Sequence, residues 1–193
     1  MRLRSLTLAV LAASLALAAP AAAEGQGTDL FAGYSFAQVG DVSRHGANAA
    51  VGFDLFGPID LFVDASGHWG SREGVGRSDL TLMAGPGARF GKRGKTLVFV
   101  RALAGLVRDR ASIEVLDVDI NESSSGFGLL AGGGVDFPIA RTLAVRAQAD
   151  YLLWDAGGDE VACLALGCPA PDGGWESSFR VSAGIVFRFG AAP

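Results

Sequence analysis

The sequence predicts a single all-β domain, an eight-stranded antiparallel up-and-down transmembrane β-barrel. Three observations predict this fold. Eight segments alternate apolar and polar residues, the connections between them alternate in length, and aromatic residues gather near the segment ends. Apolar residues make up 50% of the chain, and 28 of the 193 residues are glycine. Such a composition suits closely packed alternating strands better than long apolar helices.

The N-terminus has the pattern of a secretory signal peptide. Arg2 and Arg4 precede an apolar stretch over residues 6–19, and alanines fill the last positions before a cleavage site. We expect residues 1–23 to be removed, so that residues 24–193 form the barrel domain. Loss of the two arginines moves the formal charge from −4 to −6, and so acidic a chain is poorly suited to bind nucleic acid.

The eight segments each have about the length that a tilted strand needs to cross a bilayer. The seventh is the clearest, because Val145 and Tyr151 share one face while Arg146 and Asp150 share the other. Phe56 is out of phase with its neighbours, which indicates a β-bulge or an earlier end of the second strand. We expect strands over residues 29–38, 45–56, 59–68, 79–90, 96–108, 126–137, 142–153 and 178–189.

The connections alternate in length. The short ones cover residues 57–58, 91–95 and 138–141, and the longer, more polar ones cover residues 39–44, 69–78, 109–125 and 154–177. Outer-membrane barrels place short turns and both termini in the periplasm and long loops outside the cell. We therefore predict an outer-membrane location, with a structural or surface-interaction role carried by the loops Asp109–Ser125 and Trp154–Ser177.

Aromatic residues are expected to form a belt at each membrane interface. One group lies at the short-turn ends of the strands, and the other lies at the long-loop ends. The two groups are Phe90, Phe137 and Phe189, and Trp69, Tyr151 and Trp154.

A soluble periplasmic barrel that binds a hydrophobic ligand would show the same alternation, with its apolar face inside. Charges of mixed sign in mid-strand, small residues on the same face and aromatic residues at strand ends favour the membrane barrel. Cell fractionation separates these two alternatives.

Several strand sequences resemble those of a known family. They are Gly-Val-Asp-Phe-Pro at 134–138, Arg-x-Gln-x-Asp-Tyr at 146–151 and Val-Ser-Ala-Gly-Ile-Val-Phe-Arg-Phe-Gly at 181–190. They are similar to the small outer-membrane β-barrels, the OmpA-like and opacity-type barrels, over most of the mature chain. This resemblance implies a cell-surface barrel that is inserted among outer-membrane lipids by the outer-membrane assembly machinery.

Ten charged residues are predicted to point into the barrel. They could line a pore, but eight strands leave an interior that side chains fill, and buried charges require partners. We therefore expect them to pair and to plug the interior. The ten residues are Asp54, Asp60, Asp64, Arg89, Arg101, Asp136, Arg146, Asp150, Arg180 and Arg188.

An enzyme is the main functional alternative, because His68 lies near the external rim with Ser66 on the same face. A lipid-modifying enzyme would use such a rim site. However, strand parity points His45 outward and His68 inward, and the sequence offers no clear carboxylate to orient the histidine. We therefore expect no catalytic residues and no cofactor.

Two further motifs lie in the predicted loops. Asp117, Asp119 and Asn121 have the spacing of a calcium-binding loop, but Glu122 stands where that loop requires glycine. We therefore expect no metal site, and we interpret this stretch as a strand extension. Cys163 and Cys168 are close together in an exported chain, which favours a local disulfide.

Overall fold

The computed structural model describes residues 27–190 apart from 41, 73–74, 92–94, 116–117 and 156–173, and it gives only the backbone of 72, 75, 111–115 and 118–122. This described part contains no helix long and apolar enough to span a membrane. Its strands are β1 (Thr28–Val39), β2 (Val42–Phe56), β3 (Ile59–Arg72), β4 (Val75–Phe90), β5 (Leu97–Val115), β6 (Val118–Pro138), β7 (Leu143–Asp155) and β8 (Trp175–Phe189).

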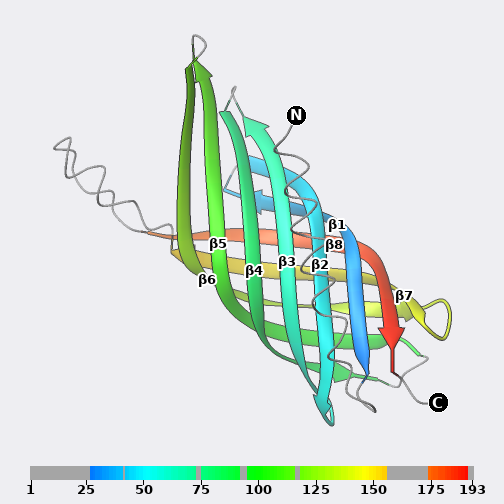
Figure 1. Cartoon of the computed structure of the whole chain (residues 1–193). Helices are drawn as coiled ribbons and strands as arrows, with labels where there is room; N and C mark the ends of the chain where they lie inside the picture. Colours follow the sequence, from blue (N-terminus) through cyan, green and yellow to red (C-terminus); the bar gives the residue numbers. More distant parts are fainter. Residues whose placement is uncertain are drawn as a thin grey trace.

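The eight strands form a closed barrel in which every strand pairs with its sequence neighbour (Figure 1). The barrel closes where β1 pairs antiparallel with β8, with Thr28 opposite Phe189. Both of these residues lie at the end of the barrel that carries the tight Gly57–Pro58 turn, where Gly57 adopts a positive φ of 58°. The predicted eight-stranded antiparallel fold is therefore confirmed.

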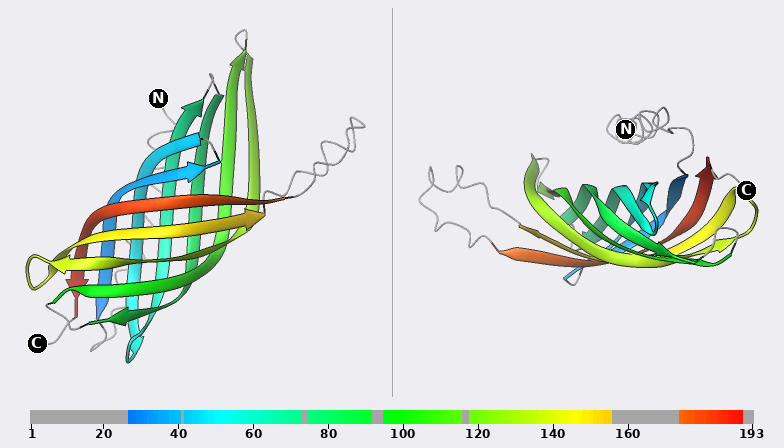
Figure 2. Two further views of the ribbon diagram at one scale, coloured as in Figure 1. Left: turned by 180° about the vertical axis from the view of Figure 1, so that it is seen from behind. Right: turned by 90° about the horizontal axis from the view of Figure 1, so that it is seen from below.

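The strands at the opposite end are longer than the sequence predicted. Residues 109–125 were expected to form a loop with a strand extension at residues 117–121, and in the structure β5 continues to Val115 and pairs with β6 up to Val115 opposite Val118. The alternation of β-branched and polar residues in this stretch continues the strand pattern, which is why the pairing persists. The β5–β6 hairpin therefore projects farthest from the barrel body (Figure 1, Figure 2).

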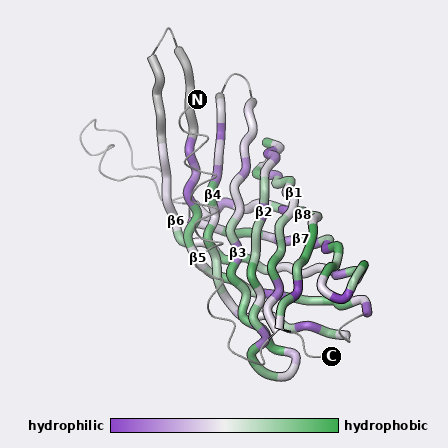
Figure 3. The backbone as a smooth tube through the Cα atoms, turned by 45° about the vertical axis from the view of Figure 1, so that its right-hand side comes forward, coloured by the Kyte–Doolittle hydropathy of each residue, from purple (hydrophilic) through white to green (hydrophobic). Residues whose placement is uncertain are grey.

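The wall presents its apolar face outward and its charged face inward. Val100 on β5 is 51% exposed, whereas the next residue, Arg101, is 3% exposed. Hydrophobic residues are concentrated in the barrel part of the strands (Figure 3). A soluble barrel would have the reverse orientation, so the observed wall is that of a membrane barrel.

The aromatic residues follow the prediction with one exception. Trp69 and Tyr151 are exposed on the outer face near the long-strand end, as Phe137 is at the other end. Trp154 is only 4% exposed, so its assignment to the outer belt was wrong. The reason is parity, because even-numbered residues of β7, such as Asp150, point inward.

The second strand contains the irregularity that Phe56 indicated. The register between β2 and β3 shifts between Asp54 and Phe56. The shift places Phe56 on the exposed apolar surface, although parity alone would point it inward.

The interior is only partly polar, which the sequence analysis did not anticipate. Large apolar side chains on the inward faces of β3 to β7 pack into one cluster beside the charged residues. The cluster contains Phe62, Met83, Phe99, Leu103, Val107, Leu130, Leu152 and Trp154.

A charge on the outer face tests this orientation. We expect Val100→Arg to lower the free energy of unfolding in lipid vesicles by about 2–4 kcal/mol, because the arginine would enter the hydrocarbon layer. The measurement is a reversible urea titration of the vesicle-inserted protein. The matched control is Ser125→Arg, at an exposed position near the interface, which we expect to cost no more than about 1 kcal/mol. Equal effects of the two changes would contradict a lipid-facing wall.

Candidate functional site: the charged interior

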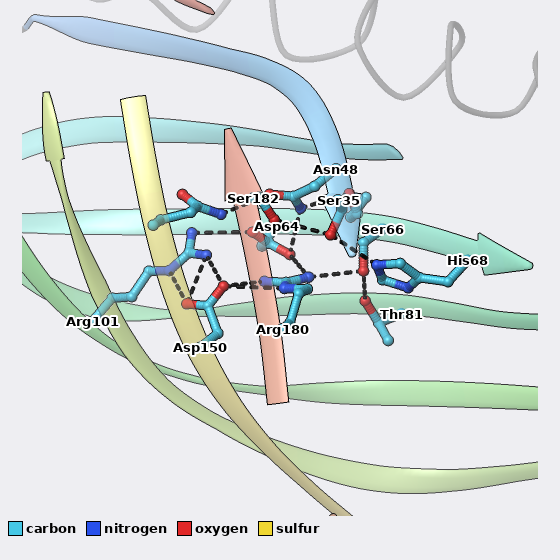
Figure 4. Close-up of polar contacts among 12 residues, drawn as sticks. Ser35, Asn48, Asp64, Ser66, His68, Thr81, Arg101, Asp150, Arg180 and Ser182 are labelled. Atoms are coloured by element: carbon cyan, nitrogen blue, oxygen red, sulfur yellow. Dashed lines mark hydrogen bonds and ion pairs between the residues drawn. The ribbon is translucent and has the colours of Figure 1, made fainter. Parts of the chain in front are cut away.

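Four of the predicted inward charges form a closed ring across the middle of the barrel (Figure 4). Arg101 binds Asp64 at 3.0 Å and Asp150 at 2.9 Å. Arg180 binds the same two carboxylates, at 3.0 Å and 2.8 Å. The four side chains come from β3, β5, β7 and β8, and all are buried. Because positive and negative groups alternate, each charge in the ring has two partners of opposite sign.

Neutral polar groups complete the hydrogen bonding around this ring. Asn48 donates to Asp64 at 3.0 Å, and Gln148 donates to the side-chain oxygen of Asn48 at 2.7 Å. Arg180 also donates to the hydroxyl of Ser66 at 2.8 Å. Burial of a charge is tolerated only when ion pairing and hydrogen bonds replace its water shell, and these contacts supply that replacement.

A second group of charges lies toward the end of the barrel that holds the termini. Asp136 and Arg146 face each other across β6 and β7 and bond through two parallel contacts of 2.7 and 2.9 Å. Arg188 adds a contact of 3.1 Å to Asp136. Arg146 also lies over the ring of Phe99, 4.4 Å from its centroid, so this pair links the charges to the apolar cluster.

Arg89 binds three carboxylates at this same end of the barrel, the end that holds the termini. Its guanidinium lies 2.6 Å from Asp29, 2.5 Å from Asp60 and 3.4 Å from Asp54. A polar cavity of about 210 Å³ adjoins this group and also contacts Arg188. Asp29 was absent from the predicted interior charges, although it shares strand parity with Gly33 and the buried Ser35 and alternation therefore points it inward.

A third group lies toward the long-strand end and was largely missed. Arg44, which is buried, binds Asp79 at 3.0 Å and Asp109 at 2.9 Å. His68 also binds Asp79 at 2.8 Å and faces Ser35 at 2.8 Å. Arg44 and Asp109 fell within predicted loops, and Asp79 was seen only as a strand start. Extension of the strands brings all of them into the interior.

The two histidines lie where strand parity predicted. His45 is exposed on the outer face and bonds to the hydroxyl of Tyr34, whereas His68 is buried inside. Ser66, which the enzyme alternative would have paired with His68, bonds instead to Thr81 at 2.7 Å and to Arg180. Two residues on the same strand and face point in parallel, so they cannot easily meet.

Two predicted features lie outside the described residues. Cys163 and Cys168 belong to the stretch 156–173, and the calcium-like motif falls on Asp117 and on residues described by backbone alone. Within the described side chains, no group of three or more His, Cys, Asp or Glu residues is arranged to hold a metal ion.

Comparisons with known proteins agree with this architecture. A family model described as "Outer membrane protein beta-barrel domain" matches residues 7–187. Neisserial surface protein A is similar in structure, with a TM-score of 0.55, 16% identity, and coverage of 86% of this chain and 97% of that one. Ail of Yersinia pestis has a TM-score of 0.57 and 15% identity, and the match covers 86% of this chain and 100% of that one. OprG of Pseudomonas aeruginosa has a TM-score of 0.51 and 9% identity, and the match covers 87% of this chain and 98% of that one. None of the curated proteins matches the chain.

Removal of one ring charge tests the energetic weight of the ring. We expect Asp150→Asn to lower the free energy of unfolding by about 3–5 kcal/mol, because Arg101 and Arg180 each lose a buried charged partner. Urea titration in vesicles measures the change. Asp155→Asn, at the exposed end of the same strand, is the control and should change stability by less than about 0.5 kcal/mol. A ring variant as stable as the control would mean that the ring contributes little.

Proposed function

Because this chain belongs to the outer membrane protein β-barrel domain family, and is therefore an outer-membrane protein, we propose that it serves as a structural and surface-interaction barrel. One observation carries the proposal. Toward the long-strand end of the barrel, the last pair between β6 and β7 is Gly128 with Trp154. The pairing between β5 and β6 continues ten residues farther along β6, to Val118. The β5–β6 hairpin thus extends well beyond the barrel and offers a regular surface to the outside.

The charge of the external segments indicates what kind of partner fits. Residues 110–125 contain four carboxylates and one arginine, and residues 154–177 contain five carboxylates with no lysine or arginine. A surface with so strong an excess of negative charge attracts basic molecules and repels acidic ones. We therefore infer a basic protein or peptide segment as the partner.

This inference separates the chain from one of its structural neighbours. Ail of Yersinia pestis has a structure in complex with the heparin analogue sucrose octasulfate, and that structure has a TM-score of 0.56 to this chain. A sulfated sugar is highly anionic. The acidic external segments of this chain would repel such a ligand, so the shared fold does not carry over the binding preference.

The paired interior supports a closed barrel rather than a pore. The ring of Asp64, Arg101, Asp150 and Arg180 spans the lumen, and apolar side chains occupy the space beside it. We propose that these side chains plug the barrel and that the protein does not conduct ions. The surface role that we propose needs neither conduction nor catalysis.

A lipid-modifying enzyme finds less support. A site for membrane lipid must face the bilayer, and of the two histidines only His45 does so, with Tyr34 as its hydrogen-bonding partner. His68 lies on the opposite face of the wall. We also propose that residues 1–23 are removed on export. The outer-membrane assembly machinery then inserts the barrel, whose outer face contacts outer-membrane lipids.

Binding by proteoliposomes tests the surface role. We expect neutral-lipid vesicles that carry the protein to retain a fluorescent lysine-rich peptide at low salt, to release it as salt rises, and to ignore labelled heparin. The decisive variant replaces the carboxylates of residues 110–125 and 154–177 by their amides, which leaves the interior Asp109 in place, and it should lose at least about tenfold in peptide affinity. The matched control exchanges Asp and Glu for each other at the same positions, which keeps the negative charge while changing the same side chains. Preference for heparin, or equal binding by both variants, would contradict the proposal.

A further inference from the structure

Three side chains near the external mouth form one hydrogen-bonded line. Ser35 Oγ lies 2.8 Å from His68 Nε2, and His68 Nδ1 lies 2.8 Å from Asp79 Oδ2. They come from β1, β3 and β4 and occupy a single row of the sheet, in which Gly46 of β2 separates Ser35 from His68. The contact between Ser35 and His68 is visible in the interior (Figure 4).

Gly46 is the reason that the imidazole can cross β2 to reach the serine. A Cβ at this position would lie 2.8 Å from the Cα of His68 and would also collide with the carbonyl oxygen of Gly67. Any other residue would therefore push the histidine or its strand away. The absence of a side chain at Gly46 leaves the direct path between Ser35 and His68.

The surrounding hydrogen bonds orient the protons along this line. Ser182 donates to Ser35 Oγ at 2.9 Å, so the hydroxyl proton of Ser35 is directed at His68 Nε2. The Nδ1 proton of His68 then points at Asp79, which Arg44 also holds at 3.0 Å. This is the order of a nucleophile, a general base and a carboxylate that orients the base.

Arg44 supplies a second, independent observation. Its side chain is fully buried, yet Nε and Nη2 have no hydrogen-bond partner among the described residues. Buried guanidinium donors without partners are costly, and they are suited to an oxygen on which negative charge develops. They lie in the same cluster, because the remaining nitrogen of Arg44 binds Asp79.

We propose that Ser35, His68 and Asp79 form a catalytic triad that hydrolyses small carboxylic esters, an activity beyond the proposed surface role. Ser35 Oγ attacks the ester carbonyl while its proton passes to His68 Nε2. Collapse of the tetrahedral intermediate expels the alcohol, which takes that proton, and leaves an acyl group on Ser35. Water, activated by the same histidine, then releases the carboxylic acid and restores the serine.

The position of the triad selects the substrate class. Ser35 points into the barrel, whereas acyl chains of the bilayer contact the opposite face of the wall, so membrane lipid is not the substrate. Ser35 is 0% exposed and His68 2%, and side-chain exposure rises along the row to 10% at Asp79 and 21% at Asp109. A small water-soluble ester would therefore enter from the external mouth.

Covalent labelling tests the proposal directly. The folded protein in detergent is treated with a small fluorophosphonate, which phosphonylates activated serines, and its intact mass and peptides are measured. We expect one adduct, on the peptide that contains Ser35, together with hydrolysis of p-nitrophenyl acetate. His68→Ala should slow both reactions about 100-fold, because the general base is lost.

Controls separate catalysis from a merely structural network. Ser35→Ala should abolish the adduct, whereas Ser66→Ala, which removes another interior hydroxyl, should retain it. Gel mobility of unheated samples confirms that each variant is folded, and the adduct site on the native chain decides the question if Ser35→Ala does not fold. Absence of an adduct on the folded native protein would overturn the proposal, because a site closed to a small phosphonate is also closed to an ester. An adduct at any other serine would overturn it too.

Discussion

The structure depends on pairing of buried charges in an interior that side chains largely fill. Eight strands enclose an interior that side chains must fill, and this chain places arginines and aspartates there in mid-strand. A ring of four residues satisfies that constraint, because each member forms ion pairs with two residues of opposite charge. The four residues are Asp64, Arg101, Asp150 and Arg180. The other interior groups are arranged above and below the ring.

Much of this arrangement was predictable from alternation alone. Parity identified all four ring members, and it separated His45 on the outer face from His68 inside. Alternation cannot show which charges meet across the lumen, because that depends on how far each strand is shifted against the next. Trp154 was misplaced because its position near a strand end suggested an aromatic belt, whereas its parity assigns it to the inner face.

The triad shows the same limit in a sharper form. A search along the sequence finds Ser66 beside His68, but the pairing of β1, β2 and β3 brings Ser35 to the histidine, and closure of the barrel lets Ser182 of β8 orient that serine. The contact between Ser35 and His68 requires the pairing of β1, β2 and β3, and the contact between Ser182 and Ser35 exists only after β1 and β8 pair. The external hairpin was predictable only in part, because residues 117–121 alternate as a strand does, whereas the polar composition of residues 109–125 as a whole favours a loop.

The central claim is that paired side chains close the lumen, and conductance across a planar bilayer tests it most directly. The folded native protein would be added at neutral pH, with its heat-dependent gel mobility as evidence that it is inserted and intact. We predict no stepwise current at any applied voltage that the bilayer tolerates. Reproducible steps of uniform size from the native protein would contradict the account, since they would require an open aqueous path through the ring.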